Sequence, residues 1–135
     1  MSTRCNVAVI LKEKDLNTRL YETKHNYGYV DTKESHPTME IYIHHDGYPD
    51  GVGKYLKKNL TAYEDVVNYI LEGDRTSAEC PYVECGENWE NDKPYFWPDI
   101  WEDKSDIPEN YLYLFKDDKW YYRFFGDEKH EWKEL

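Results

Sequence analysis

The chain has 135 residues, a length that fits one domain with a single hydrophobic core. It contains no run of about 18 apolar residues, which excludes a membrane-spanning helix, and its N-terminal sequence has no apolar signal region, so we expect no secretion. The net charge of −11 repels nucleic-acid backbones and anionic membranes, so we expect no direct binding to either.

The acidic residues are concentrated in one part of the sequence. Between Asp74 and Glu109 there are eleven acidic residues and three basic ones, a net charge of −8 that leaves −3 for the rest of the chain. The same segment carries three of the five tryptophans. Such a segment suits a basic partner or a surface that imitates DNA, although solubility alone also explains an acidic protein.

The three cysteines do not form a zinc-binding pattern. Cys80 and Cys85 have four residues between them, a wider spacing than a C-x-x-C knuckle, and no second Cys or His pair has a suitable spacing. We therefore expect neither a metal nor another cofactor. Reduced thiols are the expected state inside a cell, and one local disulfide remains open.

The first predicted strand runs from Cys5 to Leu11. Its apolar residues lie on both faces, with Val7 on one and Ala8 on the other, which predicts a central strand covered on both sides. Residues 19–23 and 27–30 are the candidates for a second strand.

Two helices are predicted in the middle of the chain. Pro49 fits the first turn of a helix that ends near Asn59. Thr61 and Glu64 form a capping box for a second helix, whose apolar positions keep helical spacing as far as the stop at Gly73.

Residues 74–110 have no sustained period, and their large aromatic residues predict a long ordered excursion rather than a disordered linker. Residues 111–125 then read as a hairpin around Asp117–Asp118. A two-residue turn would place Phe115 opposite Trp120, whereas a three-residue turn would shift this register. The C-terminal tail is expected to add a short helix.

The order of these elements predicts the fold class. Most neighbouring strands are too close in sequence for a helical crossover between them. We therefore predict a single α+β domain over residues 1–135, with a mostly antiparallel sheet of four or five strands and two helices packed on one face.

The stretch from His44 to Gly53, HHDGYPDGVG, is the first candidate site. Histidine and aspartate are common metal ligands and proton carriers, but His44 and His45 point to opposite faces while the strand from Met39 to His45 lasts. The glycine spacing before Lys54 does not match a phosphate-binding loop. A strand-to-helix turn without chemistry explains most of the stretch, and an anion site at the helix start stays open.

Two segments, MSTRCNVAV and IYIHHDGYPDGVGKYL, together resemble a group of small uncharacterised proteins of bacteriophages and prophages. Those proteins begin with a similar Met-Ser-Thr-Arg strand and carry an H-x-D-G-Y-P turn before a helix. The resemblance covers the N-terminal half and implies a phage origin and a cytoplasmic location in the host cell. It also implies a binding role, since small phage proteins often block a host defence protein or sequester a nucleotide signal. The recurring positions are Arg4, His44, Asp46, Gly47, Tyr48 and Pro49, and His45 stands where such proteins often carry Trp.

We therefore expect a non-enzymatic binding protein, an antagonist of host defence that engages a basic host protein through its acidic, aromatic-rich segment. The residues expected at this interface are Glu84, Glu87, Trp89, Glu90, Asp92, Trp97 and Trp101. One alternative is a small anionic ligand, a nucleotide or cyclic nucleotide, bound at residues 44–53. Its expected ligand-binding residues are Arg4, His44, Asp46, Gly47 and Tyr48. The other alternative is a small metal-dependent hydrolase that uses His44 and Asp46.

Overall fold

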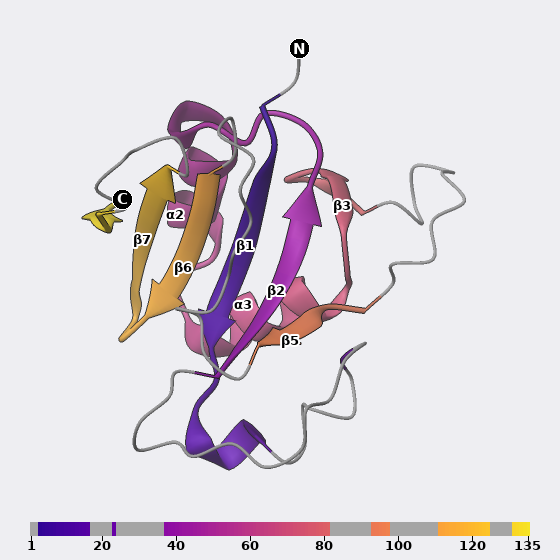
Figure 1. The fold of residues 1–135 in the computed structure, drawn as a ribbon, viewed down its shortest axis with the longest axis vertical. Helices are drawn as coiled ribbons and strands as arrows, with labels where there is room; N and C mark the ends of the chain where they lie inside the picture. The colour runs from indigo at the N-terminus through magenta and orange to yellow at the C-terminus, as the bar shows by residue number, and fades with distance from the viewer. Residues whose placement is uncertain (1–2, 17–22, 24–36, 82–92, 98–110, 125–130) are drawn as a thin grey trace.

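The computed structural model describes residues 3–16, 23, 37–81, 93–97, 111–124 and 131–135 (Figure 1). These residues form a mixed β-sheet with two α-helices, an α+β arrangement. The strands are β1 (Cys5–Ile10), β2 (Thr38–Ile43), β3 (Arg75–Ser77), β4 (Cys80–Pro81), β5 (Tyr95–Trp97), β6 (Tyr111–Lys116), β7 (Lys119–Phe124) and β8 (Lys133–Glu134). The helices are a 3-10 turn (Glu13–Asp15), a π-helical turn (Pro49–Gly53), α2 (Lys54–Asn59) and α3 (Tyr63–Leu71).

Within the described residues the sheet has eight strands, in the order β4-β3-β2-β1-β6-β7-β8, with β5 paired to β2. β1 lies in the middle, antiparallel to β2 and parallel to β6, and β2 is parallel to β3. The prediction of a mostly antiparallel sheet of four or five strands is therefore wrong. The two helices carry the chain from β2 to a parallel β3, and β6 returns beside β1 in the same direction after the acidic segment.

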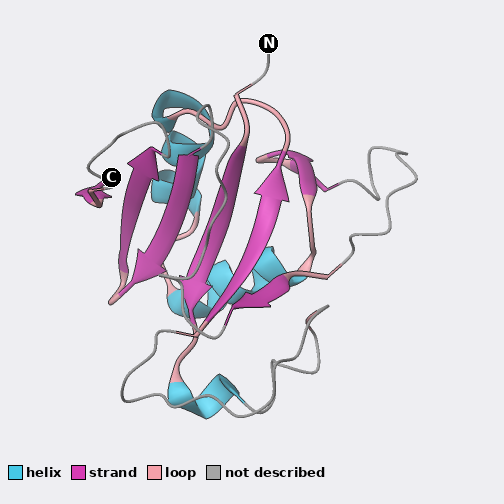
Figure 2. Ribbon diagram, in the orientation of Figure 1, coloured by secondary structure: helices cyan, strands magenta, loops and turns pink. Residues whose placement is uncertain are grey.

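Both helices pack on one face of the sheet, as predicted, and lie behind it in Figure 2. The apolar spacing explains this packing, because one stripe of each helix faces the alternating apolar positions of the sheet. Full burial of each large apolar side chain contributes about 1.5–3 kcal/mol. The side chains that form this layer include Val7, Val9, Met39, Ile41, Ile43, Leu56, Val66, Val67 and Ile70.

The opposite face of β1 is also covered. Ala8 is buried in a second apolar cluster with Leu112 and Leu114, against which Trp132 packs. This confirms the prediction that β1 is a central strand with apolar contacts on both sides.

The β6–β7 hairpin has the two-residue turn and the predicted register, with Phe115 opposite Trp120 and Tyr113 opposite Tyr122. Asp117 and Asp118 have φ angles of 52° and 62°, as a type I′ turn requires. The right-handed twist of the two strands explains why this turn type closes the hairpin.

Three local predictions need correction. α3 begins after Ala62 with no side-chain cap, so Thr61 and Glu64 do not form the predicted capping box. In the tail, Lys133–Glu134 is a strand rather than a helix, because it pairs with β7. Cys80 is disulfide-bonded, contrary to the expected reduced state, whereas Cys5 is a free thiol whose pKa is raised by complete burial.

The structure leaves one prediction untested and bears on another only for the residues that it describes. The second-strand candidates at 19–23 and 27–30 lie outside them, apart from Thr23. No helix in the described part of the chain has both the length and the apolar character needed to cross a membrane.

Candidate functional site

The corner formed by residues 44–53 is tied to the sheet through its backbone. β2 ends at Ile43, and the two histidines continue its pairing with β3. The N–H of His44 donates to the carbonyl of Arg75 at 3.1 Å, and that of His45 to the carbonyl of Thr76 at 2.9 Å. The corner is therefore held against the strand that begins the acidic segment.

Gly47 packs the corner against the start of β1. Its N–H donates to the Thr3 carbonyl at 2.8 Å, and its own carbonyl accepts a buried hydrogen bond from the Tyr113 hydroxyl at 2.7 Å. A Cβ at this position would lie 2.6 Å from the carbonyl carbon of Arg4. This close approach of two backbones explains the glycine without any ligand.

The N–H groups at the helix start donate hydrogen bonds to carbonyl groups within the corner. Asp46 has a φ of 58°, and its carbonyl accepts from the N–H of Val52 at 2.8 Å. The Tyr48 carbonyl accepts from Gly51 at 2.9 Å and, more weakly, from Gly53 at 3.5 Å. These contacts weigh against the anion site expected from free N–H groups at this end of the helix.

The two histidine rings lie edge to face, with centroids 4.5 Å apart. Because β2 ends at Ile43, the strand alternation that would separate them does not extend to His44 and His45. The Tyr42 hydroxyl and His44 Nδ1 are hydrogen-bonded at 2.8 Å. Burial raises the pKa of Tyr42, an effect that the positive charge of Arg4 partly offsets.

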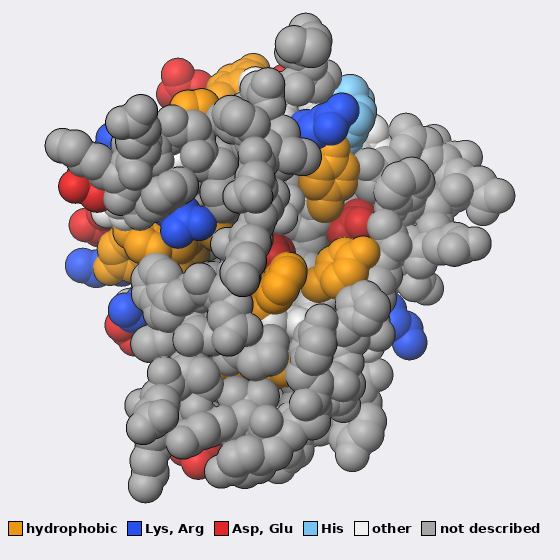
Figure 3. All heavy atoms as spheres, viewed as in Figure 1, with side chains coloured by type: hydrophobic (Ala, Val, Ile, Leu, Met, Phe, Trp, Pro, Cys, Tyr) orange, Lys and Arg blue, Asp and Glu red, His pale blue; other side chains and the backbone are white. Residues whose placement is uncertain are grey.

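This cluster does not make a metal site among the residues that the structure describes, where no group of three His, Cys, Asp or Glu side chains converges. Histidine atoms lie beside Lys and Arg atoms near the upper end of β2 on the face opposite the helices (Figure 3). Arg4 itself is exposed, and its carbonyl accepts from the N–H of Tyr111 at 3.2 Å. We call Tyr42, His44 and His45 the histidine cluster.

A pocket of about 290 Å³ opens between the corner and the β3–β4 turn. Asp46 lines it from the corner, Tyr55 from α2, Ser77 from the end of β3 and Glu79 from the turn. Asp46 belongs to the sequence-predicted ligand site and Glu79 to the acidic segment, so the fold brings these two regions together. We call this cavity the corner pocket.

The remaining predicted residues are placed unevenly. Tyr48 is 41% exposed, and its hydroxyl is 3.4 Å from Asp46 Oδ1. Trp97 lies in β5, where its indole N–H donates to the buried carboxylate of Glu40. The other predicted interface residues lie outside the described residues: Glu84, Glu87, Trp89, Glu90, Asp92 and Trp101.

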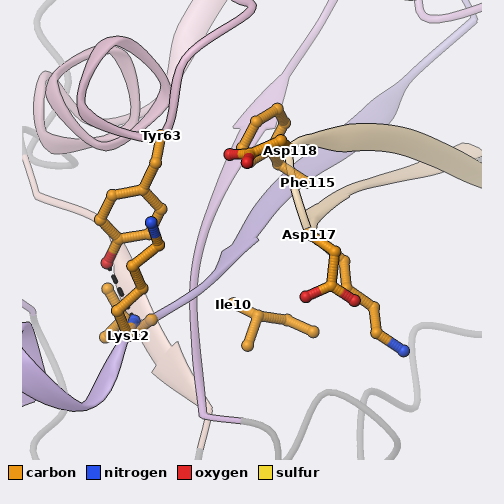
Figure 4. A pocket seen from close by; sticks show the side chains of 8 residues that line it. Ile10, Lys12, Tyr63, Phe115, Asp117 and Asp118 are labelled. Carbon is orange, nitrogen blue, oxygen red and sulfur yellow. Dashed lines mark hydrogen bonds between the residues drawn. The ribbon is translucent and has the colours of Figure 1, made fainter.

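A second pocket, of about 480 Å³, lies at the other end of the sheet, between the end of β1, the β6–β7 turn and α3 (Figure 4). Lys12 crosses one wall, with its Nζ 4.6 Å from the centre of the Tyr63 ring. The Tyr63 hydroxyl accepts from the Lys12 N–H at 3.0 Å and donates to Asp15 Oδ2 at 2.8 Å. Asp117 and Asp118 face Tyr63 and Lys12 across the opening. We call this cavity the sheet-end pocket.

Comparison with known protein families, with curated proteins and with solved structures gives no match to this chain. The resemblance to phage proteins therefore stays a prediction.

Sequence reasoning missed Tyr55 and Ser77 of the corner pocket, and it missed Lys12 and Tyr63 of the sheet-end pocket. Tyr55 and Tyr63 carried a signal only as members of an apolar helical stripe. Ser77 carried none, because its position depends on the parallel pairing of β2 with β3.

Proposed function

We propose that this protein acts by binding, and that its partner is a protein with a basic surface. We further propose that it derives from a phage or prophage and antagonises host defence. The binding surface is the acidic segment, residues 74–109. We call the rest of the chain, residues 1–73 and 110–135, the frame.

The observation that supports this proposal is the distribution of charge. Residues 74–109 contain eleven acidic and three basic side chains, a net charge of −8, whereas the remaining residues together carry −3. An almost neutral frame that carries a strongly acidic segment favours a role for that segment in electrostatic recognition. Charge complementarity of this kind raises the association rate and the specificity for a partner of opposite sign.

The attachment of the acidic segment to the sheet gives further support. β3 and β5 both lie within this segment, and both pair with β2. The Trp97 indole adds a hydrogen bond to Glu40, which also accepts from the Asn6 side-chain amide at 3.2 Å. Because a rigid support reduces the entropy lost on binding, a segment fixed at two places binds better than a free chain of equal charge.

The experiment is capture of partners from a bacterial lysate by the full-length protein, followed by titration of the purified partner in low and high salt. The proposal predicts a basic partner whose affinity falls as salt rises, since ions screen the attraction. A captured partner without a basic surface, or an affinity that does not change with salt, would contradict it.

A second candidate function is favoured by the sheet-end pocket. Its volume of about 480 Å³ lies within the usual range for small-molecule sites, and Lys12 offers a positive charge beside aromatic walls. Asp117 and Asp118 line the opposite wall, so an anionic nucleotide would place its charged group on the Lys12 side. A thermal-shift screen against nucleotides and cyclic nucleotides tests this, because a ligand that binds only the folded state raises the melting temperature. A shift that survives Lys12→Ala would argue against this pocket.

A further inference from the structure

We propose that the corner pocket receives a basic side chain of the partner, a lysine or an arginine, as the anchor of the interface. This inference rests on the proposed function and names the part of the partner that the pocket recognises. It is carried by the placement of Asp46 and Glu79, two carboxylates from distant parts of the sequence, on the rim of one cavity.

The lining of the corner pocket matches the two parts of a long basic side chain. Val52 and the ring of Tyr55 offer apolar surface to the methylene groups, while the rim offers the two carboxylates and the Ser77 hydroxyl as acceptors. None of the lining residues is basic. Its volume of about 290 Å³ is at the lower end for ligand sites, a scale that suits one side chain.

The walls of the pocket are fixed before any partner arrives. The Asp46 carbonyl accepts from Val52, which holds the corner closed around the helix start. On the other side, the Ala78 carbonyl accepts from the Tyr69 hydroxyl at 2.8 Å and from Arg75 Nε at 3.2 Å. These bonds fix the backbone that carries Asp46 and Glu79, so a cation binds there without the cost of ordering a loop.

Arg75, the basic residue of β3, does not neutralise the carboxylates of the corner pocket. Arg75 is buried, with its guanidinium 4.0 Å from the Tyr69 ring centre and its Nη1 2.8 Å from Glu72 Oε2. Its charge is thus already paired on its own side of the turn. The sheet-end pocket, in contrast, has Lys12 and Lys116 in its lining beside Asp117 and Asp118, so its acidic charges already face basic ones.

The test uses N-acetyl-arginine amide as the probe and N-acetyl-citrulline amide as its uncharged control of nearly equal shape. Binding is followed through the backbone amide NMR signals of Gly51, Ser77 and Ala78 in the full-length protein. The same titration is repeated on a double variant, Asp46→Asn with Glu79→Gln. Asparagine tolerates the positive φ of residue 46, so the variant keeps the corner, and its NMR spectrum reports whether it does.

We expect the arginine probe to shift these three amides and the citrulline probe not to do so. The double variant should bind the arginine probe roughly fivefold more weakly or worse, because charge-assisted hydrogen bonds are the stronger class. Equal shifts by both probes, no response of these amides, or unchanged affinity of the double variant would overturn the inference.

A second variant separates this inference from the proposed function. It neutralises four other acids of the segment: Glu84→Gln, Glu87→Gln, Glu90→Gln and Asp92→Asn. This variant should still bind the arginine probe at the corner pocket while it loses the basic partner. If the arginine probe leaves the pocket amides unchanged while partner capture depends on the four acids, the pocket inference fails alone. If the pocket binds arginine but no basic partner is captured, the proposed function fails.

Discussion

Gly47 and Asp46 define the corner between β2 and α2 at the scale of single residues. Gly47 allows two backbones to touch, and Asp46 takes a left-handed conformation that closes the turn onto Val52. Both roles are structural, and neither requires a ligand or a partner. The histidine cluster beside them owes its ring contact to the end of β2 at Ile43.

Replacement of Gly47 by alanine should destabilise the protein by about 1–3 kcal/mol, since its Cβ would lie 2.6 Å from a backbone carbon of Arg4. The matched control is Gly53→Ala, whose Cβ would meet only side-chain atoms of Leu135 and Tyr113, at 3.1 Å or more. At these distances the neighbouring side chains need to shift by only a few tenths of an ångström, so the loss of stability should be smaller than at Gly47. Urea unfolding measures both variants, and equal losses of stability would contradict the tight contact at Gly47.

The corner motif shows what could be predicted at this scale. Asp46 and Gly47 are recognisable as turn residues, and Pro49 as a helix start, because these preferences depend on local backbone sterics. The contact of Gly47 with Arg4 could not be predicted, because it joins backbones about forty residues apart in sequence through the fold of β1. The two histidines were recognised as candidate site residues. Their relative orientation could not be predicted, because it depends on where β2 ends.

At the scale of elements, the two helices and the hairpin could be predicted from short-range patterns, whereas the capping box, the tail and the pairing of distant strands could not. The register of the β6–β7 hairpin is the one that a two-residue turn gives, the first of the two alternatives that the sequence left open. The parallel pairing of β6 with β1 joins Tyr111 to Cys5 and leaves no local trace in either strand. The corner pocket has the same origin, since Glu79 reaches Asp46 only through the pairing of Ile43 with Arg75.

The start of α3 gives a test at the scale of an element. Ala62 occupies the N-cap position with extended φ and ψ angles of −114° and 147° and no side-chain cap. Ala62→Ser should therefore stabilise the protein by about 0.5–2 kcal/mol, because serine can accept from an unpaired N–H of the first turn. Thr61→Ala should change stability by less than about 0.5 kcal/mol. Chemical denaturation measures the stability of both variants. A loss of stability in Thr61→Ala without a gain in Ala62→Ser would support the capping box instead.

At the scale of the whole molecule, the hydrophobic core buries several ionisable groups in their neutral forms. Burial raises the pKa of the hydroxyls of Tyr63, Tyr69 and Tyr113, and it raises the pKa of the Cys5 thiol. Tyr113 also joins the hairpin to the corner through its bond to Gly47. The neutral phenols are therefore part of what holds the sheet against the helices.

The protein should consequently lose stability in alkaline solution. The folded state holds these protons more tightly than the unfolded state, so the full stability is present below the ordinary thiol and phenol pKa values, about 8.5 and 10. Above them the unfolded state gains by releasing protons. Circular dichroism and the ultraviolet absorbance of phenolate, followed together against pH, should show a late phenolate step that coincides with unfolding. Ionisation of all tyrosines while the fold persists would argue against this burial.

The contrast between a nearly neutral frame and an acidic segment is the central feature of the whole molecule. The most direct measurement compares the affinity of a captured basic partner for two variants that lose the same four negative charges. The first neutralises Glu84, Glu87, Glu90 and Asp92, and the second neutralises four exposed acids of the frame, Glu13, Glu64, Asp65 and Glu131.

If the acidic segment is the binding surface, the first variant should bind the partner at least about tenfold more weakly, while the second should stay close to the unmodified protein. The two affinities are measured by calorimetry at one salt concentration, because screening changes both. Equal weakening by the two variants would show that only net charge matters and would contradict the proposed function.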